Sequence, residues 1–298
     1  MTSKFFTTRE ICGDVTAIYG IIGEAAFLVR GSEKALLIDT LTGVGSIKAF
    51  CRELTDLPLT VVNTHGHVDH LGGNAEFERV YMHPMEMDAV HVHGSVAKKI
   101  AFLEAANRMA NLTRKGVGTA DLVREKPYYI YPITDGEYFN LGGGKVIEAI
   151  HVPGHSRGSL AMLDVRERIL FVGDSLNLGA LLFLENSTSV EEYRAGLKHL
   201  KLHAHRFDRI LLSHDPDVIF TPAQVDEAIA LCEEIMEGKD DAVPCPEPPF
   251  FFAKKHDARY RRLDGKLANI RYDSTRVFKQ ERSKEIVDYE KRKFNRFD

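Results

Sequence analysis

The side chains best suited to hold a metal ion lie close together in Val61-Val62-Asn63-Thr64-His65-Gly66-His67-Val68-Asp69-His70-Leu71-Gly72-Gly73-Asn74. Three histidines and one aspartate fall within six residues, directly after the apolar run 59–62. A short apolar run rich in β-branched residues predicts a buried strand, so the cluster begins where a strand ends. The flanking glycines allow the backbone to bend there. Since imidazole and carboxylate are preferred ligands of zinc and similar ions, this stretch predicts a metal site.

The pattern His65-x-His67-x-Asp69-His70 resembles the signature of the metallo-β-lactamase-fold hydrolases. The resemblance implies an α/β fold, a four-layer αββα sandwich, in which further metal ligands follow later strands. Three segments meet this expectation, because each is an apolar run that leads to a ligand-type residue. They are residues 146–152 before His155, residues 168–173 before Asp174, and residues 207–213 before His214.

The resemblance gives each of these seven side chains a role. It assigns a first metal ion to His65, His67 and His155, a second to Asp69, His70 and His214, and the bridge between them to Asp174. The implied cofactors are two divalent metal ions, with zinc favoured and iron or manganese as alternatives. Asp69 and Asp174 would be the catalytic carboxylates, and a metal-bound hydroxide would be the nucleophile.

The ligand types also narrow the branch of the family. A cysteine in place of Asp174 would indicate the classical β-lactamases, and a glutamate in place of His67 the di-iron flavoproteins. What remains resembles glyoxalase-II-type thioesterases and acyl-homoserine-lactonase-like enzymes. The expected function is hydrolysis of an activated carbonyl (lactone, thioester or ester) in a small molecule. The alternatives are hydrolysis of a phosphodiester or phosphonate, and a mononuclear-iron persulfide dioxygenase.

Composition is that of an ordinary globular protein, with 44% hydrophobic and 28% charged residues in 298. Apolar runs of membrane-spanning length are missing, and the four cysteines are scattered, so we expect a cytoplasmic protein without disulfides. Residues 253–298 carry 15 Lys/Arg and 8 Asp/Glu, a net charge of +7. Because the whole chain has a net charge of −4, residues 1–252 carry −11. Because the body is acidic, we do not expect nucleic acid as a partner. A homodimer is considered possible.

Two segments lie outside the core pattern. Residues 1–237 are predicted to form the catalytic domain, in which residues 85–135 are a helical insertion that covers the site. Residues 238–298 are predicted to be a linker and a basic extension that packs on the domain, with a charged helix from Arg282 to Arg296. The predicted substrate-binding residues are Arg157, Tyr128, Tyr131, Arg271 and Tyr272. Asp39, at the end of another apolar run, either supports a ligand histidine or is a plain turn residue.

Overall fold

The computed structural model describes residues 1–110, 116–215, 217–246 and 249–280. Its first half is built on a seven-stranded sheet in which spatial order follows chain order. The first four strands are antiparallel, and the last three join them in parallel. The strands are β1 (Thr7–Cys12), β2 (Val15–Tyr19), β3 (Ala25–Arg30), β4 (Ala35–Ile38), β5 (Leu59–Val62), β6 (Arg79–Met82) and β7 (Tyr129–Pro132).

A second sheet of six strands packs against the first, in the order β14-β13-β11-β10-β9-β8. Within it, β9, β11 and β13 all run in the same direction, because β10 is antiparallel to both β9 and β11, and β13 is parallel to β11. The strands are β8 (Tyr138–Asn140), β9 (Val146–His151), β10 (Leu160–Asp164), β11 (Ile169–Phe171), β13 (Arg209–Leu211) and β14 (Ile219–Phe220).

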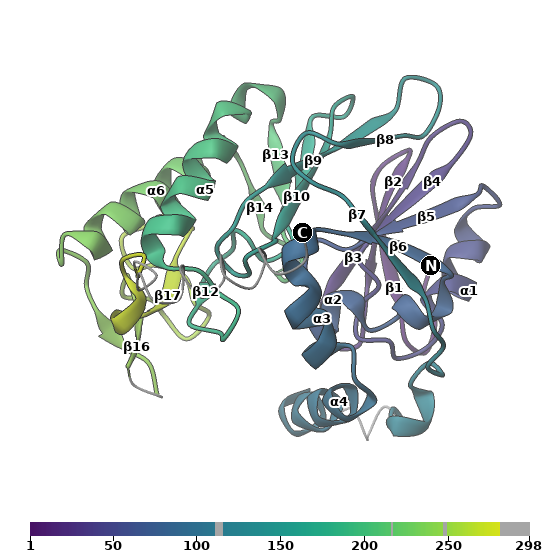
Figure 1. The fold of residues 1–298 in the computed structure, drawn as a ribbon, viewed down its shortest axis with the longest axis horizontal. Helices are drawn as coiled ribbons and strands as arrows, with labels where there is room; N and C mark the ends of the chain where they lie inside the picture. Colours follow the sequence, from purple (N-terminus) through teal and green to yellow (C-terminus); the bar gives the residue numbers. More distant parts are fainter. Residues whose placement is uncertain (111–115, 216, 247–248, 281–298) are drawn as a thin grey trace, which may run out of the picture.

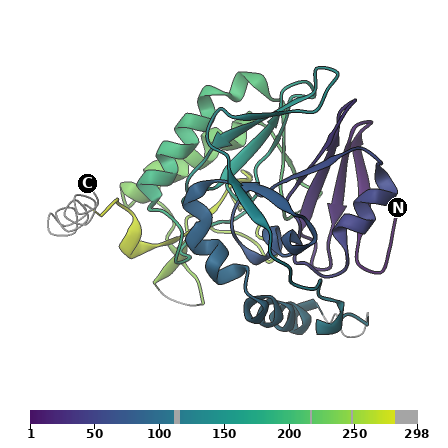
Figure 2. The ribbon, with the colours of Figure 1, turned by 45° about the vertical axis from the view of Figure 1, so that its right-hand side comes forward.

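Helices cover the outer face of each sheet, as Figures 1 and 2 show. Helix α1 (Ile47–Leu54) packs on the first sheet, while α5 (Val190–Leu202) and α6 (Pro222–Met236) pack on the second. Between the sheets lies one apolar core, in which the rings of Phe27 and Phe171 are 4.7 Å apart. Strands β3 and β4 are almost wholly apolar because both of their faces are covered. The predicted four-layer αββα sandwich is confirmed.

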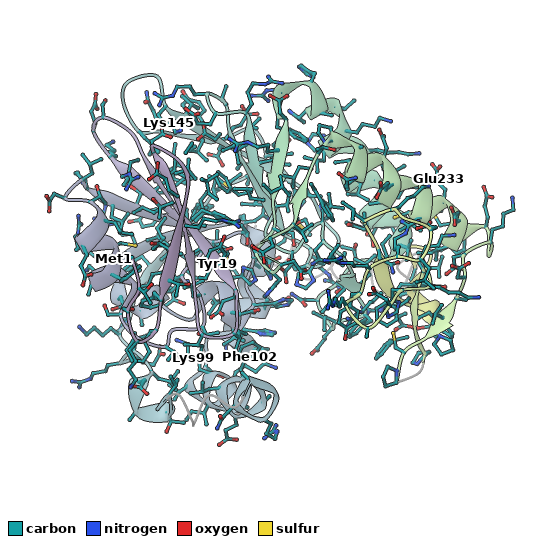
Figure 3. All side chains as sticks on the ribbon, turned by 180° about the vertical axis from the view of Figure 1, so that it is seen from behind. Met1, Tyr19, Lys99, Phe102, Lys145 and Glu233 are labelled. Carbon is teal, nitrogen blue, oxygen red and sulfur yellow. The ribbon has the colours of Figure 1, made fainter. Side chains whose placement is uncertain are left out.

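The segment predicted as a helical insertion contains two helices, α3 (Met87–His93) and α4 (Val96–Ala110). Lys99 on α4 is buried, and its Nζ donates to the carbonyl of Gly72, 2.8 Å away, just beyond the metal-ligand motif. Figure 3 labels Lys99 and Phe102, which both lie on α4. Residues 129–132 of the predicted insertion do not belong to it, because they pair with β6 as strand β7 and Ile133 enters the core. The α-helices of the insertion lie within residues 87–110 of the described chain.

The later part of the chain adds a small sheet of four strands in the order β12-β17-β16-β15. Its members are β12 (Ala180–Leu182), β15 (Val243–Pro244), β16 (Phe250–Phe252) and β17 (Ile270–Asp273). Ala253, Ala268, Ile270 and Tyr272 are buried in the same cluster as α5 and α6, so this part of the extension packs on the body. The predicted helix 282–296 lies outside the described residues.

The remaining helical segments are short. They comprise the single turn α2 (Val68–Leu71) and the 3-10 helices Asn74–Glu76, Pro84–Glu86, Thr119–Asp121, Ala204–Arg206 and Ser274–Arg276. Across the described residues, none of the helices has the length and apolar character that crossing a membrane requires.

Candidate metal centre

The seven predicted ligands come from loops at one edge of the sandwich. His65 and His67 follow β5, and Asp69 and His70 lie on the adjoining turn α2. The other three follow β9, β11 and β13, in the order His155, Asp174 and His214. Because these three strands run in the same direction, their carboxyl ends meet at the same edge of the second sheet. Topology alone therefore brings together side chains that are up to 149 positions apart (214 − 65).

The donor atoms of the seven side chains converge. His67 Nδ1 and His155 Nε2 are 2.8 Å apart, and His155 Nε2 lies 3.5 Å from Asp174 Oδ2. His214 Nε2 lies 3.4 Å from Asp69 Oδ2 and 3.4 Å from Asp174 Oδ1. In three sets, each with one donor atom per residue, all these atoms lie within 4.8 Å of one another: His65, His67 and His155; His65, His70 and Asp174; and Asp69, His70 and His214.

Three of these donor atoms are buried without a hydrogen-bond partner in the described structure: His65 Nε2, His70 Nε2 and Asp174 Oδ1. Leaving a buried polar atom unpaired costs roughly 1–3 kcal/mol, so three such atoms at one point need an explanation. A cation held among them would satisfy all three. The donor set of imidazoles and carboxylates also suits zinc and similar divalent ions. The residues present therefore fit a metal ion.

Four of the histidine rings have a second contact that fixes their orientation: His65, His67, His70 and His155. The Nδ1 of His70 lies 2.8 Å from Asp39 Oδ2, which leaves its Nε2 for the centre. Asp39 also accepts hydrogen bonds from the backbone N–H and the hydroxyl of Thr64, at 2.7 and 2.8 Å. Of the two sequence interpretations of Asp39, the structure favours support of a ligand histidine. Such contacts select the tautomer and the basicity of a ligand.

His67 and His155 are oriented by strand β12 and the loop that follows it. His67 Nε2 lies 3.0 Å from Asn186 Oδ1, and His155 Nδ1 lies 3.2 Å from the carbonyl oxygen of Leu181. These contacts leave His67 Nδ1 and His155 Nε2 directed at each other and at the centre. Asn186 could not be predicted from the sequence, because a single amide side chain in a loop belongs to no periodic pattern.

Glu86 is a second residue that sequence reasoning missed. Its buried carboxylate accepts hydrogen bonds from the backbone N–H of Gly66 at 2.7 Å and of Gly158 at 2.6 Å. It therefore joins the loop of His65 and His67 to the loop of His155. A side chain at Gly158 would come within 2.9 Å of Glu86, so glycine permits this approach.

Burial and neighbouring charges set the protonation states of the cluster. Burial lowers the pKa of His155 to about 3, and His67 nearby adds to this effect. Burial and the neighbouring His70 likewise lower the pKa of His65. Burial opposes ionisation of Asp69 and Asp174, but the nearby His70 and His214 outweigh it and lower both pKa values. His65 and His155 are therefore neutral and both aspartates are ionised at neutral pH, the states in which these four side chains bind a metal. At His70 and His214 the neighbouring carboxylates outweigh burial: Asp39, Asp69 and Asp174 raise the pKa of His70 to about 9, and Asp174 and Asp69 raise the pKa of His214.

Access to the centre is from the side of His214. Its side chain is 32% exposed, that of Asp69 15% and that of Asp174 11%, whereas His70 is fully buried. His93, on α3 of the insertion, and His83, just before the insertion, belong to none of the three donor sets. The ring of His93 is 4.5 Å from that of His67, and the ring of His83 stacks on His151 at 4.3 Å.

The predicted substrate-binding residues do not gather at the centre in this structure. Tyr128 packs against the outer core beside α1, and Tyr131 lies against Tyr81. Tyr272 is buried and its hydroxyl donates to Asp240 at 2.7 Å, while the Arg271 guanidinium lies over Phe252 and Tyr260. These four side chains have partners away from the donor atoms because they belong to strands of the core and the extension, or precede one directly.

Arg157 differs from these four. Its side chain is exposed beside the His155 loop, and it lines a groove of about 1340 Å³ together with residues of α5 and of the extension. In the described part of the chain its guanidinium has no hydrogen-bond or ionic partner. Contact of Arg157 with substrate stays a prediction.

Residues 20–206 match the family model of the metallo-β-lactamase superfamily. The chain belongs to this superfamily. Among solved structures, the metallo-β-lactamase from Pontibacter korlensis superposes with a TM-score of 0.52, covering 76% of this chain and 97% of that one. Since the two are only 18% identical, this likeness concerns the fold alone.

Two curated relatives in this superfamily carry names of thioester-cleaving enzymes. The human acyl-coenzyme A thioesterase MBLAC2 is 32% identical over 168 residues, which cover 52% of this chain and 59% of the human protein. The hydroxyacylglutathione hydrolase GloC of Haemophilus influenzae is 28% identical over 130 residues, covering 43% of this chain and 55% of that protein. The chain thus spans less than two thirds of the length of these relatives.

Proposed function

We propose that this protein is a metal-dependent hydrolase that cleaves a thioester of a small molecule into a carboxylic acid and a thiol. The observation that supports the proposal most strongly is the convergence of seven donor side chains, three of which have a buried donor atom without a hydrogen-bond partner. The two relatives named as thioesterase and hydroxyacylglutathione hydrolase favour thioesters among the activated carbonyls. The donor set divides into one group of three histidines and one of Asp69, His70 and His214, which supports two divalent ions, with zinc favoured.

When bound, such ions supply a Lewis acid and lower the pKa of a coordinated water to roughly 7. The contribution of the chain is to hold and orient the groups around that water. Asp39, Asn186 and the Leu181 carbonyl fix the rings, and Glu86 fixes the distance between two ligand loops. Asp174 lies between the two groups, so we assign it to bridge them.

We assign Asp69 to accept the proton from the attacking water. Its Oδ2 is the atom near His214 and His70, so its other carboxylate oxygen is left for the proton. Water adds to the acyl carbon, the bond between carbon and sulfur breaks, and the sulfur leaves as a thiolate that takes up a proton. The exposed edge at His214 gives the thioester access.

The test is a comparison of substrates with the metal-loaded protein. We expect turnover of acyl-coenzyme A or hydroxyacylglutathione thioesters to exceed that of lactones, and two metal ions per chain by elemental analysis. Turnover of bis-p-nitrophenyl phosphate alone would favour the phosphodiesterase alternative instead. One iron per chain with oxygen-dependent persulfide consumption would favour the dioxygenase. The homodimer and the cytoplasmic location remain predictions from the sequence.

A further inference from the structure

The end of β12 and the loop that joins it to α5 contact two metal-donor histidines at three points. We name residues 181–188 the orienting segment. The carbonyl oxygen of Leu181 lies 3.2 Å from His155 Nδ1, and the Ser187 hydroxyl donates to the carbonyl of His155 at 2.7 Å. Asn186 Oδ1 lies 3.0 Å from His67 Nε2. The position of this segment therefore decides which nitrogen of each ring faces the centre.

The C-terminal extension holds the orienting segment through the side chain of Arg276. Its Nη2 donates to the carbonyl of Leu184 at 2.9 Å, and its Nη1 donates to the carbonyl of Ser187 at 3.3 Å. Asp273 accepts from the Nε of the same guanidinium at 3.3 Å. The planar guanidinium can hold two carbonyl groups at a fixed separation, which an ammonium group cannot do in the same way. The two carbonyls lie on either side of Asn186.

Backbone pairing fixes the start of the same segment. Strand β17 pairs with β12 in parallel, with Leu181 opposite Arg271. The N–H of Ala180 donates to the carbonyl of Asn269 at 2.9 Å. Figure 1 shows β12 and β17 side by side, apart from the first sheet. The extension thus holds the orienting segment at its beginning by the strand and at its middle by Arg276.

We infer that Arg276 is a positioning residue of the metal centre, which acts on His67 and His155 through the orienting segment without touching either ring. The inference rests on the proposed metal centre. It gives the extension a role that differs from the substrate contact predicted for Arg271 and Tyr272. Contacts to the ligands of a metal commonly change its affinity 10- to 100-fold, so the effect of Arg276 is measurable as metal affinity.

The experiment compares Arg276→Met with Lys279→Met in the full-length chain. Arg276→Met keeps the apolar stem and removes both hydrogen bonds to the orienting segment. Lys279→Met is the matched control, because Lys279 is an exposed cation of the same extension that pairs with Glu192 at 3.5 Å. Zinc affinity is measured by competition with a chelator. We expect affinity to fall by about 10- to 100-fold in Arg276→Met and by less than about twofold in Lys279→Met.

A second readout reports on the rings themselves. In ¹H–¹⁵N spectra of the metal-free protein, His67 should be protonated at Nε2 in the wild type and in Lys279→Met. It should show a mixture of tautomers in Arg276→Met. If Arg276→Met folds poorly, Arg276→Lys takes its place, because lysine keeps the charge but cannot span both carbonyls.

The outcomes separate the two proposals. A wild-type protein that binds no divalent metal overturns the proposed metal centre. A wild type that binds zinc, with unchanged affinity and unchanged His67 tautomer in the Arg276 variant, overturns the inference alone. Weaker zinc binding together with a mixed tautomer supports it.

Discussion

At the scale of single residues, Asp174 is the side chain on which the proposed two-metal arrangement depends. Its two carboxylate oxygens lie 3.4 Å from His214 Nε2 and 3.5 Å from His155 Nε2. Replacing Asp174 by asparagine keeps the shape and removes the charge. We expect metal content to fall from two ions per chain toward one, and turnover to fall by at least about 100-fold. Elemental analysis and thioester kinetics measure both.

The matched control for this change is Asp217→Asn. The Asp217 side chain is almost fully exposed, lies 3.6 Å from the Arg9 guanidinium and belongs to none of the three donor sets. Metal content and turnover should stay at wild-type values in that variant. Full metal content and undiminished turnover in Asp174→Asn would remove Asp174 from the bridge.

Replacing Glu86 tests whether a residue outside the seven predicted ligands supports the structure of the site. In Glu86→Ala the N–H groups of Gly66 and Gly158 lose their acceptor, and each unpaired buried group costs roughly 1–3 kcal/mol. We expect unfolding in urea to show a loss of about 2–4 kcal/mol. Asp88→Ala, at an exposed position two residues later, should lose less than about 1 kcal/mol. Equal losses in the two variants would contradict the role of Glu86.

Some residues of the candidate site can be predicted from the sequence and others cannot, and the difference has a physical cause. His65, His67, Asp69 and His70 form a local pattern, because the same turn carries all four. Glu86 and Asn186 act through partners at distant positions in the chain, and an acid or an amide alone resembles an ordinary surface residue. The roles of Glu86 and Asn186 come from hydrogen bonds to residues that are distant in the sequence. No local sequence pattern contains those contacts.

At the scale of elements, the turns at the end of the sandwich opposite the metal centre are joined by a buried lysine. Lys145 precedes β9, whereas His155 follows it, and Figure 3 shows Lys145 at the far end from α4. Its fully buried ammonium lies 2.5 Å from Asp164 Oδ2 and 2.8 Å from Asp14 Oδ2. The network connects the ends of the two sheets, because Asp164 ends β10 and Asp14 precedes β2.

Replacing Lys145 by methionine should therefore destabilise the fold without changing the metal centre. Removing one partner of a buried ion pair typically costs 3–5 kcal/mol, and we expect a loss of about that size in the free energy of unfolding. Lys34→Met, at an exposed turn position, should change it by less than about 0.5 kcal/mol. Zinc affinity of the folded Lys145→Met protein should be that of the wild type. Weaker zinc binding by Lys145→Met would contradict the independence of the metal centre from the Lys145 network.

The extent to which elements could be predicted also has a physical cause. Strands β3, β4 and β5 can be predicted because each is almost wholly apolar, although β4 and β5 have only four residues. In the sheet β12-β17-β16-β15, the two residues of β15 and the three of β12 and of β16 are too few to show an alternation of apolar and polar positions. The aromatic run at residues 129–132 predicts an extended segment but not its partner, because β6, with which it pairs, is distant in the sequence.

At the scale of the whole molecule, metal binding and stability should be linked. The buried donor atoms without partners make the metal-free centre costly, and any ion that binds only the folded state stabilises it. Zinc at about 1,000 times its dissociation constant should add roughly 4 kcal/mol. We expect a chelator to lower Tm and added zinc to restore it. Equal Tm values for the chelator-treated protein and the zinc-saturated protein would contradict the proposed metal centre.

The αββα sandwich places ligands from both sheets at one edge, and the central claim is that this edge is a metal-dependent thioesterase site. The most direct test is to remove metal by dialysis against a chelator and to follow acyl-coenzyme A hydrolysis while zinc is added back. The account predicts no turnover without metal, and activity that rises to a plateau at two zinc ions per chain. Hydrolysis that persists in the metal-free protein, or that never appears at any zinc level, would contradict it.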